Sequence, residues 1–282
     1  MFCHSHAMQE LIRVAERAAP SEAPILLTGE SGTGKEGMAH LIHKLSGREK
    51  LLKLECAALE PRGLEETYGE AWGSTLLLRD ICELPDQTQQ ALHWLLGKAE
   101  HAAGERLHPR IIAITDETLD EAAGSGRLAG NLYYQLSTVP LQLPSLRHRR
   151  EDIIPLANRF LSGLALEAGR PMTGFTQAAS DLLAGYDWPG NLTQLQNVVQ
   201  RGVLFCETAL IDAADLQIEP PTRKRPEARP TATKLTLMQD AERNLLIDTL
   251  RQTHGNKVQT AARLGISRQT LYNKIRAYGI EG

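Results

Sequence analysis

A glycine-rich segment between a short apolar run and a helical pattern constrains this 282-residue chain more than any other feature. The apolar run is Pro24–Thr28, the glycine-rich turn is Gly29–Glu36, and helical spacing continues to Leu45. The turn fits the first seven positions of Gly-x-x-x-x-Gly-Lys-[Ser/Thr]. In such a loop, backbone N–H groups converge on phosphates and the helix N-terminus adds positive potential. The segment predicts a nucleotide-binding loop in which Lys35 reaches the β- and γ-phosphates.

The rest of the first half alternates between strand and helix patterns. Helical spacing is present over 7–19 and over Gln87–Leu96. The apolar strand candidates are Leu51–Leu54, Thr75–Leu78, Arg110–Thr115 and Ser137–Leu141. Alternation of this kind predicts an α/β fold, a parallel sheet with helices on both faces.

Strand patterns end where the second half begins. Between Arg150 and Leu210 the helical patterns are Ile153–Ala165, Thr176–Gly185 and Thr193–Leu204, so an all-helical subdomain is expected. The proline-rich stretch 219–230 has no apolar face and reads as an extended linker. The last 48 residues regain helical periodicity and predict a third, all-α unit.

The charge of the chain is divided unevenly. The net charge is −3, but residues 223–282 hold 12 Lys/Arg and 5 Asp/Glu, which gives +7. Residues 1–222 hold 19 Lys/Arg and 29 Asp/Glu, which gives −10. A basic tail on an acidic body predicts a separate module that binds nucleic acid.

The basic tail has helix-turn-helix spacing. A first helix fits Lys257–Leu264, Gly265 permits a tight reversal, and Ser267 is a good N-cap for the second helix. Side chains on the first turns of that second helix would reach base edges or phosphates, the alternative being a solvated charged face. The candidate DNA-binding residues are Lys257, Ser267, Arg268, Gln269, Thr270, Asn273, Lys274 and Arg276. An apolar stripe over 234–253 packs on these helices, forms a dimer seam, or does both.

Several classes of protein are excluded. The longest apolar runs, such as Ile111–Ile114, are far shorter than the roughly 18 residues of a membrane span. The start of the chain has no export signal, and the four cysteines are too scattered for a disulfide framework or a zinc site. We expect a cytoplasmic protein with no membrane partner.

Four segments together resemble the AAA+ domain of bacterial enhancer-binding proteins, the sigma-54-dependent activators. They are Gly29–Glu36, Leu132–Tyr134, Leu143–Ile153 and Trp188–Leu192. The resemblance covers residues 7–215, and the C-terminal unit is similar to the Fis-type helix-turn-helix of that family. It implies an AAA+ P-loop α/β subdomain over 1–147, an AAA+ helical lid subdomain over 148–217, a Pro/basic linker over 218–234 and a Fis-type helix-turn-helix DNA-binding domain over 235–282.

One part of the family's machinery is missing. Members use ATP hydrolysis to remodel the sigma-54 polymerase, which they touch with a loop bearing Gly-Ala-Phe-Thr-Gly-Ala. Here Leu64–Glu70 passes almost directly into Ala71–Leu76, without that loop.

The resemblance also implies a depleted reaction centre. Arg79-Asp80 replaces the Asp-Glu that holds magnesium and positions water, and an arginine would repel the metal ion. The other departures from the family are Asp116 for the first-sensor Asn, Ala129 and Gln135 for the arginine fingers, and Thr193 for the sensor arginine. Glu36 departs from the general loop motif, in which a Ser or Thr supplies the usual magnesium-binding hydroxyl. One arginine finger contributes on the order of 10³–10⁵ in rate. We therefore assign no catalytic residue and no metal site, and expect hydrolysis to be absent or negligible.

The phosphate cradle itself is intact. The candidate nucleotide-binding residues are Gly29, Glu30, Ser31, Gly32, Thr33, Gly34, Lys35, Glu36, Arg79 and Asp80. We expect Arg79 to replace the charge of magnesium by pairing with the γ-phosphate or with Asp80; the alternative is an Arg79–Asp80 arrangement that stabilises an empty relic pocket. ATP or ADP is the expected ligand, and the changed metal-holding positions argue against a dependence on magnesium.

Three functions remain open. The first is a sequence-specific DNA-binding transcriptional regulator that acts as a repressor, a co-regulator or a modulator of an intact activator. Its expected partners are double-stranded DNA, further copies of itself in a dimer or higher oligomer, and an intact enhancer-binding protein. The second is a working ATPase activator that uses Asp80 or Glu83 as its catalytic carboxylate. The third is an interaction protein that tethers partners without reading DNA. Because the family-like region starts near Met1, no N-terminal sensing domain is expected.

Overall fold

The computed structural model describes residues 4–101, 108–116, 126–218, 249, 253 and 257–263. The chain divides into two units, Met1–Ile218 and Glu219–Gly282. None of the helices in the described part of the chain has the length and hydrophobicity that crossing a bilayer requires.

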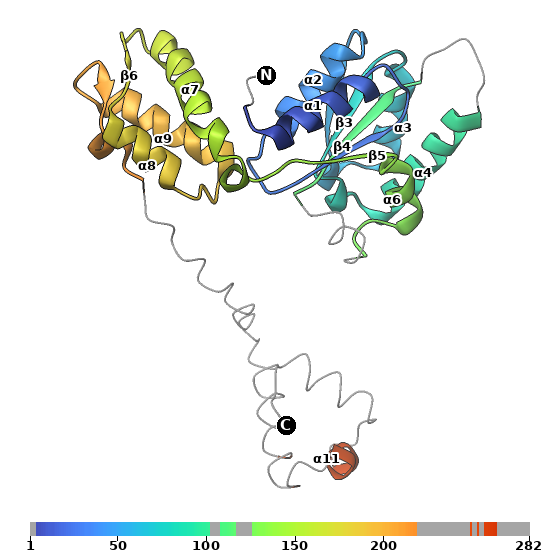
Figure 1. Cartoon of the computed structure of the whole chain (residues 1–282). Helices are drawn as coiled ribbons and strands as arrows, with labels where there is room; N and C mark the ends of the chain where they lie inside the picture. Colours follow the sequence, from blue (N-terminus) through green and yellow to red (C-terminus); the bar gives the residue numbers. More distant parts are fainter. Residues whose placement is uncertain are drawn as a thin grey trace. The chain divides into compact units, whose positions relative to one another are not determined.

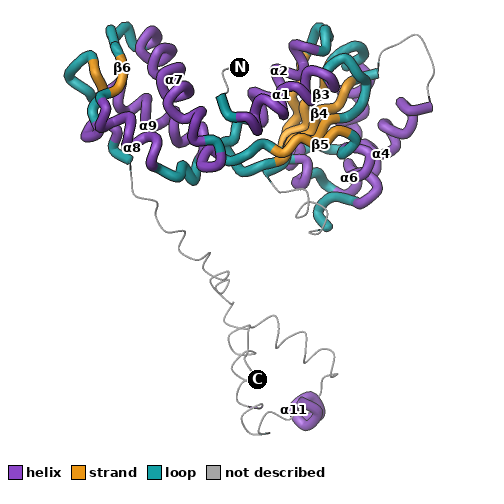
Figure 2. The backbone as a smooth tube through the Cα atoms, in the orientation of Figure 1, coloured by secondary structure: helices purple, strands orange, loops and turns teal. Residues whose placement is uncertain are grey.

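A five-stranded sheet forms the centre of the α/β subdomain in the first unit (Figure 2). Its strands are β1 (Ile25–Thr28), β2 (Leu51–Glu55), β3 (Thr75–Arg79), β4 (Arg110–Ile114) and β5 (Val139–Gln142), in the order β2-β3-β4-β1-β5. All neighbouring strands are parallel. The predicted parallel α/β sheet is confirmed, and its strand order places the carboxyl ends of β1, β3 and β4 at one edge.

Helices cover both faces of this sheet (Figure 1). On one face lie α1 (His6–Ala18) and α2 (Lys35–Leu45), which pack on alternate strand residues such as Leu27 and Ile112. On the other lie α3 (Pro61–Glu70), α4 (Asp86–His101) and α6 (Gly130–Leu136), which pack on the intervening residues such as Leu26 and Ile111. The two-residue period of the strands thus gives the sheet two buried faces.

The lid subdomain contains α7 (Ile153–Glu167), α8 (Gln177–Gly185) and α9 (Asn191–Phe205), close to the predicted helices. Its core includes the fully buried Trp188, whose indole N–H donates to the carbonyl oxygen of Leu183 at 2.9 Å. The expectation of an all-helical subdomain is wrong in one detail. The strands β6 (Gly174–Phe175) and β7 (Leu210–Ile211) form a small parallel pair, too short to leave a two-residue period in the sequence.

Two short 3₁₀ turns, η3 (Leu146–His148) and η4 (Arg150–Asp152), connect β5 to α7. Asp152 is fully buried and accepts hydrogen bonds from the backbone N–H and the hydroxyl of Ser5, at 2.9 and 2.6 Å. Since Ser5 is the N-cap residue of α1, the start of the first helix is fixed to the start of the lid.

The second unit is described only in part. Helix α11 (Lys257–Arg263) corresponds to the first predicted helix of the helix-turn-helix. The buried hydroxyls of Thr253 and Thr260 lie 2.6 Å apart, which places Thr253 against α11. The proline-rich linker, the rest of the apolar stripe and the second helix lie outside the described residues.

Candidate nucleotide pocket and DNA-binding unit

The glycine-rich loop joins β1 to α2 through backbone conformations that only glycine adopts easily. Gly29 and Gly32 have φ of +133° and +76°. A Cβ would lie 2.6 Å from the carbonyl oxygen of Leu143 at Gly29, and 2.5 Å from that of Gly190 at Gly32. The second approach brings the lid backbone directly onto the loop.

Hydrogen bonds from the lid hold this loop. The fully buried Asn191 donates through Nδ2 to the carbonyl oxygen of Ser31 at 2.9 Å and accepts from the N–H of Leu146 at 2.7 Å. The N–H of Leu192 donates to the carbonyl oxygen of Gly32 at 2.8 Å. The lid motif Trp-Pro-Gly-Asn therefore shapes the phosphate loop.

Two arginines at the start of the lid complete the support. Arg147 pairs with Glu30, one of its contacts being 2.9 Å long, and this hydrogen bond lowers the pKa of the Glu30 carboxyl. Arg149 is buried and donates to the carbonyl oxygen of Thr33 at 2.6 Å. The Thr33 hydroxyl donates to the carbonyl oxygen of Glu30 at 2.8 Å. The side chains of Glu30 and Thr33 therefore form contacts that support the loop.

The loop, the ends of β3 and β4, and the lid line a pocket of about 590 Å³, within the roughly 300–1,000 Å³ typical of ligand sites. Seven of the ten predicted nucleotide-binding residues line it: Ser31, Gly32, Gly34, Lys35, Glu36, Arg79 and Asp80. The lining residues that sequence reasoning had not assigned to nucleotide are Ile114, Asp116, Phe160, Leu192, Thr193 and Gln196.

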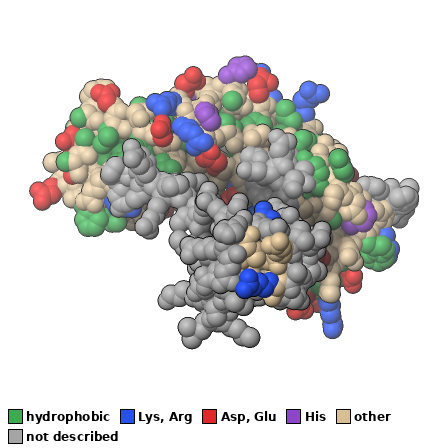
Figure 3. Space-filling view, turned by 90° about the horizontal axis from the view of Figure 1, so that it is seen from below, with side chains coloured by type: hydrophobic (Ala, Val, Ile, Leu, Met, Phe, Trp, Pro, Cys, Tyr) green, Lys and Arg blue, Asp and Glu red, His purple; other side chains and the backbone are tan. Residues whose placement is uncertain are grey.

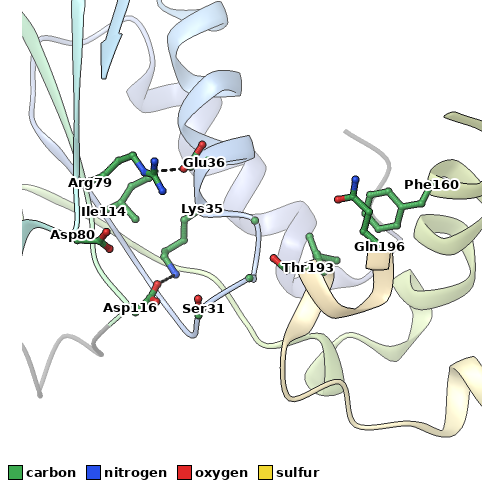
Figure 4. A pocket seen from close by; sticks show the side chains of 13 residues that line it. Ser31, Lys35, Glu36, Arg79, Asp80, Ile114, Asp116, Phe160, Thr193 and Gln196 are labelled. Atoms are coloured by element: carbon green, nitrogen blue, oxygen red, sulfur yellow. Dashed lines mark ion pairs between the residues drawn. The ribbon is translucent and has the colours of Figure 1, made fainter. Parts of the chain in front are cut away.

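Lys35 lies at the base of the pocket with only 6% of its side chain exposed. Its ammonium group donates to the carbonyl oxygens of Gly29 and Glu30 at 2.6 and 2.9 Å. It also forms a 2.6 Å ion pair with Asp116, which follows β4 (Figure 4). A lysine ammonium has three donors, so one protein carboxylate occupies the donor not used by the loop.

Arg79 forms ion pairs with two glutamates among the described residues. Its Nε lies 2.9 Å from Oε1 of Glu36, as Figure 4 shows, and its Nη1 lies 2.6 Å from Oε1 of Glu55. The expected pairing with Asp80 is wrong. Successive strand residues point to opposite faces, whereas Glu55 is the cross-strand neighbour of Arg79 in the register of β2 and β3. Asp80 follows in a left-handed conformation, with φ +54°.

These residues do not fit the magnesium ion that the family resemblance implies. Magnesium prefers near-octahedral oxygen ligands, but Glu36 is paired with a guanidinium and Asp116 with an ammonium group. Within the described ranges, no group of three or more His, Cys, Asp or Glu side chains is arranged to hold a metal ion.

The positions corresponding to other charge-stabilising residues have local contacts instead. Oε1 of Gln135 lies 2.6 Å from Nδ1 of His93 on α4, and the N–H of Ala129 donates to Gln89 at 2.8 Å. The hydroxyl of Thr193 lines the pocket beside the loop (Figure 4). Glu83, the alternative catalytic carboxylate, lies 3.5 Å from Nη1 of Arg127.

Of the candidate DNA-binding residues, only Lys257 is described, and it lies at the start of α11. Ser267, Arg268, Gln269, Thr270, Asn273, Lys274 and Arg276 lie outside the described residues. On the face drawn in Figure 3, acidic and basic side chains of the first unit are interspersed, with no large basic patch among its described residues. The assignment of DNA binding to the basic tail rests on its sequence.

Three family models match consecutive parts of the chain. Residues 2–146 match the sigma-54 interaction domain, residues 147–233 the AAA+ ATPase lid domain, and residues 237–278 the bacterial regulatory protein Fis family. Together they give the fold: an AAA+ P-loop sheet, a lid and a Fis-type helix-turn-helix domain.

Characterised relatives cover nearly the whole chain. The transcriptional regulatory protein ZraR of Salmonella typhimurium is 35% identical, over 98% of this chain and 68% of its own length. The regulatory protein AtoC of Escherichia coli is 34% identical, over 99% of this chain and 67% of its own length.

Solved structures agree with this assignment. NtrX from Brucella abortus, crystallised in complex with ATP, has a TM-score of 0.67 at 30% identity and covers 99% of this chain and 69% of its own. The RuvB branch migration motor of Thermotoga maritima has a TM-score of 0.57 at 15% identity and covers 98% of this chain and 86% of its own, so it supports the fold alone. This chain belongs to the sigma-54-dependent transcriptional regulators, a family of DNA-binding proteins with an AAA+ domain and a Fis-type helix-turn-helix.

Proposed function

We propose that this protein is a sequence-specific DNA-binding regulator whose AAA+ domain binds nucleotide without hydrolysing it. The observation that carries the proposal is the 2.9 Å ion pair between Glu36 and Arg79. The resemblance places Arg79 where relatives hold the metal ion, and Glu36 stands at the loop position that usually supplies a magnesium-binding hydroxyl. Phosphoryl transfer depends on that ion to neutralise developing charge, so the pair argues against turnover.

The connection between α3 and β3 argues against direct activation of the sigma-54 polymerase. Helix α3 ends at Glu70 and β3 begins at Thr75, so only residues 71–74 join them. This is where the resemblance places the loop that touches the sigma factor. A repressor, a co-regulator or a modulator of an intact activator fits a chain without this loop. In an assay with sigma-54 polymerase, the protein should give no open complex alone and should change the activity of an intact enhancer-binding protein.

The proposed DNA contacts come from the two helices of the predicted helix-turn-helix in the basic tail. Arg268 and Asn273 read base edges, while Lys257 and Arg276 bind phosphates. Arg268→Ala should weaken binding to a DNA fragment identified by genome-wide mapping about 10- to 100-fold, since one good base contact is worth roughly 1–3 kcal/mol. The control is Arg13→Ala on α1, where 67% of the side chain is exposed. Unchanged affinity of Arg268→Ala would favour a tethering protein that does not read DNA.

Self-association belongs to the same proposal. A dimer brings two helix-turn-helix units to two half-sites, as in other regulators of this architecture. Light scattering on the full chain, with and without DNA, should give a mass of at least two copies; a monomer under both conditions would contradict this part.

A further inference from the structure

The Glu36–Arg79–Glu55 arrangement places a protein cation at the edge of the pocket. Arg79 lines the pocket and keeps 38% of its side chain exposed, while the two glutamates hold its guanidinium on either side, at 2.9 and 2.6 Å. A guanidinium fixed in this way offers donors to phosphate oxygens. The N–H groups that the glutamates do not use are the donors that Arg79 offers to a phosphate where relatives have a metal ion.

The ion pair between Lys35 and Asp116 marks the position that a phosphate group would take in the deeper part of the pocket. The Asp116 carboxylate lies 2.6 Å from the Lys35 ammonium group, and 51% of its side chain is exposed. A phosphate oxygen needs this same ammonium donor. Because Asp116 follows the end of a strand and is half exposed, its side chain can be displaced by an incoming phosphate.

The net charge of the pocket favours the binding of a diphosphate over that of a triphosphate. The charged lining residues are Lys35, Arg79, Glu36, Asp80 and Asp116, which are two cations and three carboxylates. A terminal third phosphoryl group adds negative charge to a pocket that already has one carboxylate in excess. The arginines and the metal ion that meet this group in relatives correspond here to Gln135, Thr193 and the Glu36–Arg79 pair.

From these contacts we infer that the ligand of the pocket is a nucleoside diphosphate bound without a metal ion. The inference rests on the proposed function, in which the AAA+ domain binds nucleotide without hydrolysing it. The loop and Lys35 hold the two phosphates, Arg79 offers its remaining N–H donors, and the displaced carboxylate of Asp116 opposes a third phosphoryl group.

The experiment is a titration of the full chain with fluorescent ADP and fluorescent ATP, each in EDTA and in excess magnesium chloride. ADP should bind equally well within about two-fold in both buffers, and ATP about five- to ten-fold more weakly in EDTA, the effect of one extra charge in a partly exposed site. ATP binding as tightly as ADP in EDTA, a ten-fold gain for ADP from magnesium, or no binding of either nucleotide would each overturn the inference.

Two sets of variants test which residues determine the preference for ADP and the independence from magnesium. Asp116→Asn removes one carboxylate and should tighten ATP more than ADP, so that the difference between them falls to about two-fold; an unchanged difference overturns the role given to Asp116. The control, Asp187→Asn, changes a carboxylate outside the pocket, 67% exposed and paired with Arg150. The double variant Glu36→Thr/Arg79→Asp should make nucleotide affinity depend on magnesium by at least ten-fold, and no gain overturns the assignment of that pair to the place of the metal ion.

The failure of this inference is distinguishable from that of the proposed function. DNA affinity is measured on the same samples. ATP binding as tightly as ADP in EDTA, with intact DNA binding and no phosphate release, overturns the diphosphate ligand and leaves a DNA-binding regulator that binds nucleotide. Release of phosphate from ATP, or no binding of any nucleotide, overturns the proposed function.

Discussion

Replacement of Asn191 tests how strongly the lid holds the phosphate loop. Asn191→Ala leaves the N–H of Leu146 without its 2.7 Å acceptor and removes donors to Ser31 and Glu30 at 2.9 and 3.2 Å. An unsatisfied buried N–H costs about 1–3 kcal/mol and each lost hydrogen bond about 1 kcal/mol. Asn191 also has φ +50°, where alanine is about 1 kcal/mol less favourable than glycine. With the middle of the first range, the total is about 5 kcal/mol.

Calorimetry of the full chain measures this cost. At about 2–4 °C per kcal/mol for a unit of this size, the Tm of Asn191→Ala should fall by about 10 °C or more. Asn191→Gly relieves the backbone strain and should recover about 1 kcal/mol, whereas Asn158→Ala, at an exposed position of the same lid, should change the stability by less than about 0.5 kcal/mol. A Tm shift below 2 °C for Asn191→Ala would refute the reasoning that the lid supports the loop.

Three further predictions concern the loop and the core. Gly32→Ala should lower the Tm and nucleotide affinity together, since its Cβ would lie 2.5 Å from a lid carbonyl oxygen; an unchanged Tm would contradict that approach. The pKa of Glu30 is lowered from 4.5 by Arg147, so the pair stabilises the fold above this pH and less as the pH falls through the folded-state pKa. The difference in urea stability between wild type and Glu30→Gln should therefore narrow below pH 4.5, and a constant difference would argue against this pair. Burial raises the pKa of the Cys56 thiol to about 12, and Cys82 and Cys206 are buried as well. In a Cys3→Ala variant at pH 8, the remaining thiols should therefore react with a disulfide reagent only after unfolding. Rapid reaction of the native protein would contradict this burial.

The main elements of the fold follow from local patterns. Short apolar runs separated by helical spacing predict a parallel sheet, and a Gly-rich turn followed by Lys35 predicts where the phosphate loop lies. The short strands β6 and β7 were not predictable in this way, because two residues carry no period. Helix α3 was also missed: it begins at Pro61, a favourable first position, but has only two fully buried apolar side chains.

The pairings within the pocket needed the structure. Arg79 and Asp80 are adjacent in sequence, yet Arg79 contacts Glu55 because the register of β2 and β3 places those residues opposite each other. Likewise, the sequence marks Asp116 only as a departure from the family's Asn, and its pairing with Lys35 arises because β4 lies beside β1. The lid motif identified the family, but its role in holding the loop depends on the position of Asn191 in space.

The measurement that tests the central claim most directly is phosphate release from saturating ATP in magnesium, with Lys35→Ala as the matched control. The Glu36–Arg79 ion pair and the substituted charge-stabilising positions predict that the wild type and Lys35→Ala release phosphate at the same background rate. Turnover above background that Lys35→Ala abolishes would contradict the account and make this chain a working ATPase.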